Sequence, residues 1–161
     1  MNEFFLNILA TIVGGLLLTF CLFLLNEYCF NKKNLTGEWD VTVKVQKSSY
    51  SSFENLSIKF KFHLLQKGSE ISGSGEKVQD INPDGSNTIF DREKRIIVHI
   101  DGYYERKYIR KSNIFLSITE DGEQRETRVT YFLRINNATN LKGTFISTAG
   151  DASGQIEMTK S

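Results

Sequence analysis

Cysteine, histidine and proline are scarce in this chain of 161 residues, and each shortage excludes a kind of site or fold. The two cysteines, Cys21 and Cys29, lie in or beside an N-terminal apolar stretch, so the rest of the chain can hold neither a disulfide framework nor a thiolate metal site. The two histidines, His63 and His99, fall in separate predicted strands without a cysteine or an H-x-x-E pattern, so no metal site is expected. The single proline, Pro83, falls in a predicted turn, where it removes no hydrogen bond from a sheet.

Basic residues are absent from the N-terminal part of the chain. All 20 Lys and Arg residues lie after residue 31, together with 17 of the 19 Asp and Glu residues, so that region has a net charge of 20 − 17 = +3. This small excess argues against a DNA or RNA polymer as partner. The sequence also contains no G-x-S-x-G motif, no Walker loop and no zinc-ligand spacing. We therefore expect a protein that is not an enzyme and needs no cofactor.

An apolar stretch without charged residues runs from Phe4 to Leu25. As a helix, its 22 residues would be about 33 Å long, enough to span a bilayer core of about 30 Å. A cleaved signal peptide is the alternative, but no Lys or Arg precedes the stretch and no A-x-A cleavage site follows it. We therefore predict that residues 1–30 form an uncleaved transmembrane anchor.

The charges that flank this stretch predict its orientation. Lys32 and Lys33 follow it closely, so by the positive-inside rule the single-pass anchor leaves the N-terminus outside and the rest of the chain in the cytoplasm. Three glycosylation triplets, which begin at Asn34, Asn55 and Asn137, would oppose this orientation only in a eukaryotic lumenal domain.

Small residues recur four positions apart within the stretch. Ala10 is followed by Gly14, and Thr11 by Gly15, which would let a second helix approach closely in the membrane. We expect a homo-oligomer that forms in part through this face. The alternative is that glycine and alanine are simply common in membrane helices.

The region from residue 31 to 161 alternates between apolar and polar residues, as strands do. In the first run, Trp39, Val41 and Val43 fall on one side, with Asp40 and Thr42 on the other. Turn sequences separate the runs. The predicted strands are Leu35–Val45, Leu56–Leu64, Glu70–Val78, Arg95–Ile100 continuing through Tyr108, Asn113–Thr119, Glu126–Ile135, Leu141–Thr148 and Gly154–Lys160.

Eight short antiparallel strands without a helix among them predict an all-β domain, either a small closed barrel or a sandwich. We favour the barrel, because closure removes exposed edges and strand glycines allow the bends that closure requires. The interior of such a barrel is filled by side chains or holds one small ligand. A set of five phenylalanines would fill it if all pointed inward: Phe60, Phe62, Phe115, Phe132 and Phe145.

The segment GYYERKYIRK, residues 102–111, combines three tyrosines with four cations. Tyrosine rings can stack on bases, and arginine can bind two phosphate oxygens at once. Arg128, Tyr131 and Arg134 on a later strand offer the same two chemistries. From these residues we predict that Tyr104, Arg106, Arg128 and Tyr131 bind the ligand. A solvated strand edge that is merely rich in tyrosine is the alternative.

Three sequence segments carry a resemblance to a known family. LTGEW opens the first strand, LLQKGSEISGSGE covers the second hairpin, and LKGTF with GDASGQIEMTK closes the chain. With the N-terminal apolar stretch, this pattern resembles the membrane-anchored β-barrel effectors of bacterial CBASS anti-phage systems. Members of that family have two membrane spans, whereas this sequence shows one. Dividing the segment Phe4–Phe30 at Gly14-Gly15 would leave halves too short to cross a bilayer.

The resemblance implies that the barrel binds a cyclic di- or trinucleotide made on infection. Binding would then drive assembly of several copies in the bacterial inner membrane, disrupt the lipid bilayer and stop the infected cell. The alternative is a lipocalin-like barrel on the same anchor, which binds an apolar ligand or a protein partner and has no toxic activity. The first function needs a polar pocket with Arg and Tyr, and the second needs an apolar one.

The junction between the apolar stretch and the first strand, residues 26–34, is short. A flexible linker of tens of residues would uncouple the barrel from the membrane segment. We therefore expect that ordering of the barrels also orders the helices.

Overall fold

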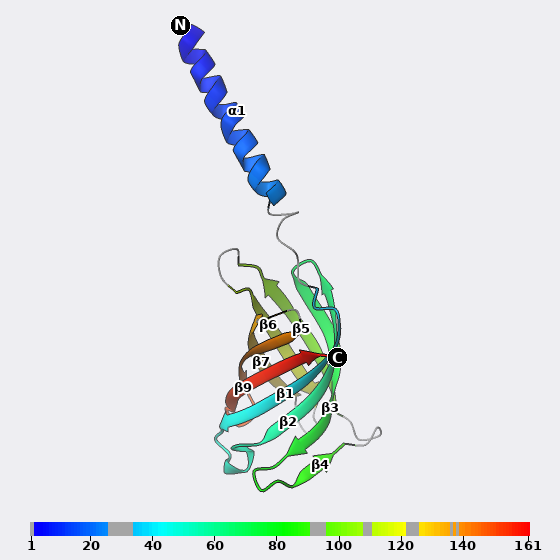
Figure 1. Ribbon diagram of the computed structural model, residues 1–161. Helices are drawn as coiled ribbons and strands as arrows, with labels where there is room; N and C mark the ends of the chain where they lie inside the picture. Colours follow the sequence, from blue (N-terminus) through cyan, green and yellow to red (C-terminus); the bar gives the residue numbers. More distant parts are fainter. Residues whose placement is uncertain are drawn as a thin grey trace. The chain divides into compact units, whose positions relative to one another are not determined.

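The computed structural model describes residues 2–25, 34–90, 96–107, 111–121, 126–135, 137 and 139–161. It divides the chain into two compact units, Met1–Lys33 and Asn34–Ser161 (Figure 1). The first unit contains a helix and the second contains the strands. The predicted boundary at residue 30 lies outside the described residues.

The helix, α1 (Asn2–Leu24), is apolar on all sides. Its segment Glu3–Leu24, 22 residues with a mean hydropathy of 2.2, is long and apolar enough to cross a membrane. The hydroxyls of Thr11 and Thr19 donate hydrogen bonds to backbone carbonyl oxygens four residues earlier, at 2.8 and 2.9 Å. Both hydroxyls are therefore satisfied without water, as a membrane interior requires. Such a helix near the N-terminus is either a membrane anchor or a signal sequence.

The second unit is an antiparallel β-barrel (Figure 1). Hydrogen bonding runs around it in the order β1, β2, β3, β5, β6, β7, β8, β9, and the pairing of β9 with β1 closes the ring of eight strands. The strands are β1 Gly37–Lys47, β2 Ser57–Lys67, β3 Glu70–Ile81, β4 Asn87–Ile89, β5 Ile97–Glu105, β6 Asn113–Asp121, β7 Glu126–Ile135, β8 Asn140–Ser147 and β9 Ser153–Lys160. The closed eight-stranded barrel predicted from the alternation is confirmed, and the sandwich is excluded.

One strand was not predicted. The three residues of β4 pair with residues 79–81 of β3, beside the ring rather than in it. A run of three residues is too short to show alternation. The turn before β4 is held by Asp84, which accepts hydrogen bonds from the backbone N–H and the hydroxyl of Ser86 at 2.8 and 2.7 Å.

The barrel interior is filled by inward-pointing side chains. Trp39 has no exposed surface, and its indole Nε1 donates a hydrogen bond to the Leu35 carbonyl oxygen at 2.8 Å. Phe62 stacks on Tyr131 with 6.3 Å between ring centroids, and Phe145 meets Tyr131 edge-on at 6.4 Å. Aliphatic residues from the ring strands complete this core, among them Val41, Leu64, Ile71, Val98, Ile100, Leu116, Leu133, Leu141, Ile156 and Met158.

The phenylalanines do not all point inward. Phe60, Phe62 and Phe145 are buried, whereas Phe132 is 39% exposed and Phe115 lies on the outward side of β6. The core is nevertheless continuous around the barrel. Close approach of the backbones allows this packing. A side chain at Gly143, for example, would meet the backbone carbonyl oxygen of Phe132.

The antiparallel order gives the barrel two distinct ends. The end at which the chain enters β1, here called the Asn34 end, also carries the β2–β3, β5–β6 and β7–β8 connections. The other end, here called the Asp84 end, carries the β1–β2, β3–β4, β6–β7 and β8–β9 connections.

Candidate ligand-binding groove

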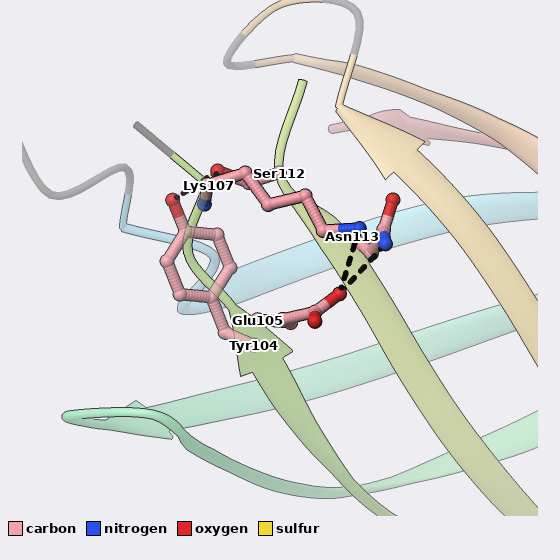
Figure 2. Close-up of polar contacts among 5 residues, drawn as sticks. All are labelled: Tyr104, Glu105, Lys107, Ser112 and Asn113. Carbon is pink, nitrogen blue, oxygen red and sulfur yellow. Dashed lines mark hydrogen bonds and ion pairs between the residues drawn. The ribbon is translucent and has the colours of Figure 1, made fainter. Parts of the chain in front are cut away.

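Two of the predicted ligand residues, Tyr104 and Arg106, lie at the Asn34 end of the barrel. Tyr104 is the second-last residue of β5, and Arg106 directly follows the strand. Tyr104 packs against the core, and its hydroxyl donates a hydrogen bond to Ser112 Oγ at 3.2 Å (Figure 2). Ser112 Oγ also accepts a hydrogen bond from the backbone N–H of Lys107 at 3.3 Å. These bonds connect the end of β5 to the start of β6. The half-buried Tyr104 ring is therefore a structural part of this corner.

The charged groups at the same corner are arranged around Glu105. Its Oε2 accepts a hydrogen bond from Asn113 Nδ2 at 2.7 Å and forms an ion pair with Lys107 Nζ at 3.3 Å (Figure 2). The Asn113 amide, with a smaller contribution from Lys107, holds the pKa of Glu105 below its ordinary value. Part of the positive charge in this segment is thus already balanced by the protein.

Arg128, the third predicted residue, lies far from this corner. Arg128 pairs with Thr119 of β6, whereas Tyr104 pairs with Ile114 of the same strand. Five strand positions correspond to about 17 Å. The Arg128 side chain is 70% exposed, and its Nε pairs with Glu126 Oε1 at 2.7 Å. Arg128 therefore does not meet Tyr104 or Arg106.

Tyr131, the fourth predicted residue, belongs to the core. It is 2% exposed between Phe62 and Phe145, and burial raises the pKa of its hydroxyl. A ligand base could not stack on this ring without opening the barrel. The structure therefore does not bring the four predicted residues together, and their role in binding stays a prediction.

The described surface has a groove elsewhere, on the outer wall of the barrel. It encloses about 940 Å³ and crosses β6, β7, β8, β9 and β1. Two rows of outward side chains run across these strands through directly paired residues. The row nearer the Asn34 end is Asn113, Arg134, Lys142, Glu157 and Thr42, and the next row is Phe115, Phe132, Thr144, Gln155 and Lys44.

The first row is cationic because it holds two cations, Arg134 and Lys142, and one acid, Glu157. Lys142 Nζ lies 2.8 Å from Glu157 Oε1, and Asn140 Nδ2 donates a hydrogen bond to the same oxygen at 3.2 Å. These two contacts, with Lys44 nearby, hold the pKa of Glu157 below its ordinary value. Within the described part of the chain, the exposed Arg134 guanidinium has neither a hydrogen bond nor an ion pair. It is therefore available for an anionic ligand.

The second row begins with two aromatic rings on the outer wall, of which Phe132 is exposed and Phe115 half-buried. Phe115 and Phe132 meet edge-to-face with ring centroids 5.7 Å apart. On the adjacent strand, Tyr103 stacks on Phe115 at 4.7 Å and is itself 52% exposed. Exposed rings beside cations can bind a flat, negatively charged ligand, because the rings offer stacking faces and the cations bind phosphate.

The apolar–polar alternation along β6 and β7 identifies these groove residues. Phe115 lies between Ile114 and Leu116, and Phe132 lies between Tyr131 and Leu133. On each of these strands, alternate residues form two sets, and the set with more apolar residues points into the barrel. Phe115, Phe132 and Arg134 belong to the other set and therefore point outward. The prediction instead followed the local density of tyrosine and arginine, which does not distinguish the two faces of a strand.

Two other kinds of site, a metal site and an internal ligand site, can be compared with the described residues. These contain no cluster of three or more His, Cys, Asp or Glu side chains arranged to hold a metal ion. His63 and His99 each pair with Ser74 from opposite sides, so one strand separates them. The lipocalin-like alternative requires an apolar cavity, but the inward positions are occupied by the packed core.

Comparisons with known proteins support the fold. No protein-family model matches the sequence, and no curated protein matches it either. Among solved structures, the chain is similar to a redesigned β-barrel, with a TM-score of 0.55 and 13% sequence identity. The match covers 79% of this chain and 91% of that one. At this identity the likeness extends to the barrel fold alone.

Proposed function

We propose that this chain is a membrane-anchored receptor whose barrel binds a cyclic oligonucleotide in the outer groove. The observation that carries the proposal is the pair of adjacent rows on the barrel wall, with Arg134 and Lys142 in one and Phe115 and Phe132 in the other. A cyclic di- or trinucleotide has phosphates and flat bases in one small molecule. Its recognition needs cations and aromatic faces close together.

In this proposal the bound ligand drives assembly of several copies in the bacterial inner membrane, and the assembly disrupts the bilayer. The apolar helix α1 supports the membrane part, with the N-terminus outside and the barrel in the cytoplasm as the flanking lysines indicate. The resemblance to CBASS effectors supports the defensive role. No catalytic step is proposed, because binding and assembly suffice.

Binding can be tested by calorimetry on the full-length chain in detergent micelles, titrated with a panel of cyclic di- and trinucleotides. A lost charge-assisted contact typically costs about 1.5–3 kcal/mol, so Arg134→Ala should weaken binding roughly ten- to a hundred-fold. Phe132→Ala should lose a stacking contact worth about 1–3 kcal/mol. Both side chains point outward, so neither substitution should lower the melting temperature of the free barrel by more than a few degrees.

Arg128 provides a matched control for Arg134. Both are exposed arginines on the outer face of β7, but Arg128 is paired with Glu126 and lies outside the groove. Arg128→Ala should therefore bind like the wild type. If Arg128→Ala or Arg106→Ala abolished binding while Arg134→Ala retained it, the site would be the one predicted from the sequence and the groove assignment would be wrong. If no cyclic oligonucleotide bound the wild type, the receptor function itself would fail.

A further inference from the structure

The charged residues at the two ends of the barrel differ in sign. Around the connections at the Asn34 end, the described residues include five cations and three acids. The cations are Lys67, Arg106, Lys107, Lys111 and Lys160, and the acids are Glu38, Glu70 and Glu105. Around the connections at the Asp84 end, the described residues are mainly acidic. The acids are Glu54, Asp84, Glu126 and Asp151, and the cation of the connections is Lys47, with Lys59 and Arg128 two positions inside β2 and β7.

The topology produces this separation from residues that are distant in sequence. Lys67 ends β2, Arg106 and Lys107 follow β5, and Lys111 precedes β6, yet the β2–β3 and β5–β6 connections both lie at the end where Asn34 leads into β1. Lys67, Lys107 and Lys111 are exposed, and the Lys107 side chain is 39% accessible despite its ion pair with Glu105. An exposed pair of this kind contributes little energy, so Lys107 can exchange it for another anion.

The chain itself limits how far this basic end can be from a membrane that contains α1. Eight residues, 26–33, separate the last described residue of the first unit from Asn34. Fully extended, the nine residue steps from residue 25 to Asn34 span at most about 30–32 Å. Within that reach the basic surface can approach the bilayer to about a Debye length, roughly 8–10 Å, where the negative potential of anionic lipids acts on it.

We propose that the Asn34 end of the barrel is a docking surface for anionic phospholipid headgroups. The lipid phosphates would bind Arg106, Lys107, Lys111 and Lys67, while the acidic Asp84 end would be repelled from the same surface. The barrel would thus be oriented by its own charge asymmetry as well as by the chain. This docking does not depend on a nucleotide. Lys111 also borders the groove, whereas Lys67, Arg106 and Lys107 lie outside it.

The experiment uses the full-length chain in nanodiscs of phosphatidylcholine alone or of phosphatidylcholine mixed with phosphatidylglycerol. Acetylation rates of individual lysines, measured by mass spectrometry, report their accessibility. Lys107 and Lys111 should react at least about fivefold more slowly in the anionic discs. This factor corresponds to the free energy with which an anionic bilayer surface attracts one lysine or arginine, about 1 kcal/mol. Lys47 and Lys59, near the opposite end, serve as internal controls and should react equally in both. High salt should remove the difference, because it screens the attraction.

A double variant, Lys67→Gln with Arg106→Gln, keeps both reporter lysines and removes two of the cations. It should lose most of the protection, whereas Lys47→Gln should leave the protection unchanged. Trp39 fluorescence shows whether each variant remains folded.

Extending the junction by about twenty Gly/Ser residues after Asn34 separates headgroup binding from simple crowding by the anchor. Protection by anionic lipid should persist in the extended chain. Equal rates in both kinds of disc would overturn the proposal, and so would protection of Lys47 in place of Lys107. The nucleotide titrations are done in detergent without lipid, so either proposal can fail while the other stands.

Discussion

The assignment of inward and outward faces can be tested with two phenylalanines on adjacent strands. Phe145 on β8 is 3% exposed and contacts the Tyr131 ring, while Phe132 on β7 is 39% exposed on the outer wall. The same substitution, Phe→Ala, removes the same atoms at both sites. Only the first should leave a cavity inside the barrel.

The expected magnitudes differ severalfold. Truncation of a fully buried phenylalanine costs about 3–5 kcal/mol, because the transfer free energy and the cavity both count. A domain of this size has a total stability of about 5–15 kcal/mol, so Phe145→Ala removes a large part of it. At roughly 4 °C per kcal/mol, the melting temperature should fall by about 12–20 °C. Phe132→Ala should cost no more than about 1 kcal/mol, since surface substitutions away from special features change little.

The assay is urea unfolding of the full-length chain in detergent, followed by tryptophan fluorescence. Trp39 is the single tryptophan, and its complete burial makes its emission a reporter of the barrel alone. Similar losses of unfolding free energy for both variants would refute the face assignment, and with it the outer-wall location of the groove. A destabilised Phe132→Ala that bound nucleotide normally would refute it most directly.

Three further predictions concern Glu120 at the Asp84 end, the junction of residues 26–34 and the helix α1. At the Asp84 end, burial raises the pKa of Glu120 inside the barrel, with opposing effects from the Lys77–Asp80 ion pair of 2.8 Å. The pKa of Glu120 is higher in the folded state than in the unfolded state. The contribution of protonated Glu120 to the unfolding free energy is therefore fully present below the ordinary glutamate pKa, and it is lost as the pH rises through the pKa of the folded state. Glu120→Gln should therefore gain unfolding free energy over the wild type as pH rises, and a difference that stayed constant from pH 4 to pH 8 would exclude this cause. Inserting about twenty Gly/Ser residues after Asn34 should leave nucleotide binding intact and weaken toxicity in cells, whereas full toxicity would contradict coupling through the junction. Replacing Gly14 and Gly15 with Leu should reduce ligand-dependent crosslinking in membranes without affecting insertion, and unchanged crosslinking would mean that the barrels alone assemble.

The sequence predicts the barrel well because period-two alternation and turn residues are local signals. The predicted Glu126–Ile135 coincides with β7, and Asn113–Thr119 differs from β6 by two residues at one end. The observed β3 continues three residues beyond its predicted end. Its register with β2 shifts opposite Lys59 and Phe60, and beyond this shift β3 still pairs with β2 and also pairs with β4. Such an irregularity depends on three strands at once, which no local pattern records.

The candidate site was less predictable, because it depends on which side chains meet across strands. Tyr131 and Arg134 are three positions apart on β7, so they point to opposite faces, and the composition of the segment does not show this. Lys142 and Lys44 reach the groove only because β8, β9 and β1 are neighbours in the closed ring. Sequence separation between these residues exceeds the range of any motif.

A filled interior also restricts how a ligand could act. The described strands pair with one another around a closed ring, and the core is packed from Leu35 through Met158. Switching by rearrangement needs two packings of similar free energy, and a closed ring around a filled core does not offer an obvious second one. A nucleotide bound on the outer wall would instead change the charge and shape of that wall. Under the proposed function we therefore expect the ligand to act by joining barrels, so ligand-bound and ligand-free barrels should differ in association state much more than in their internal hydrogen-exchange protection. Extensive loss of protection in the core strands on binding would show that the barrel opens, and that the signal passes through its interior.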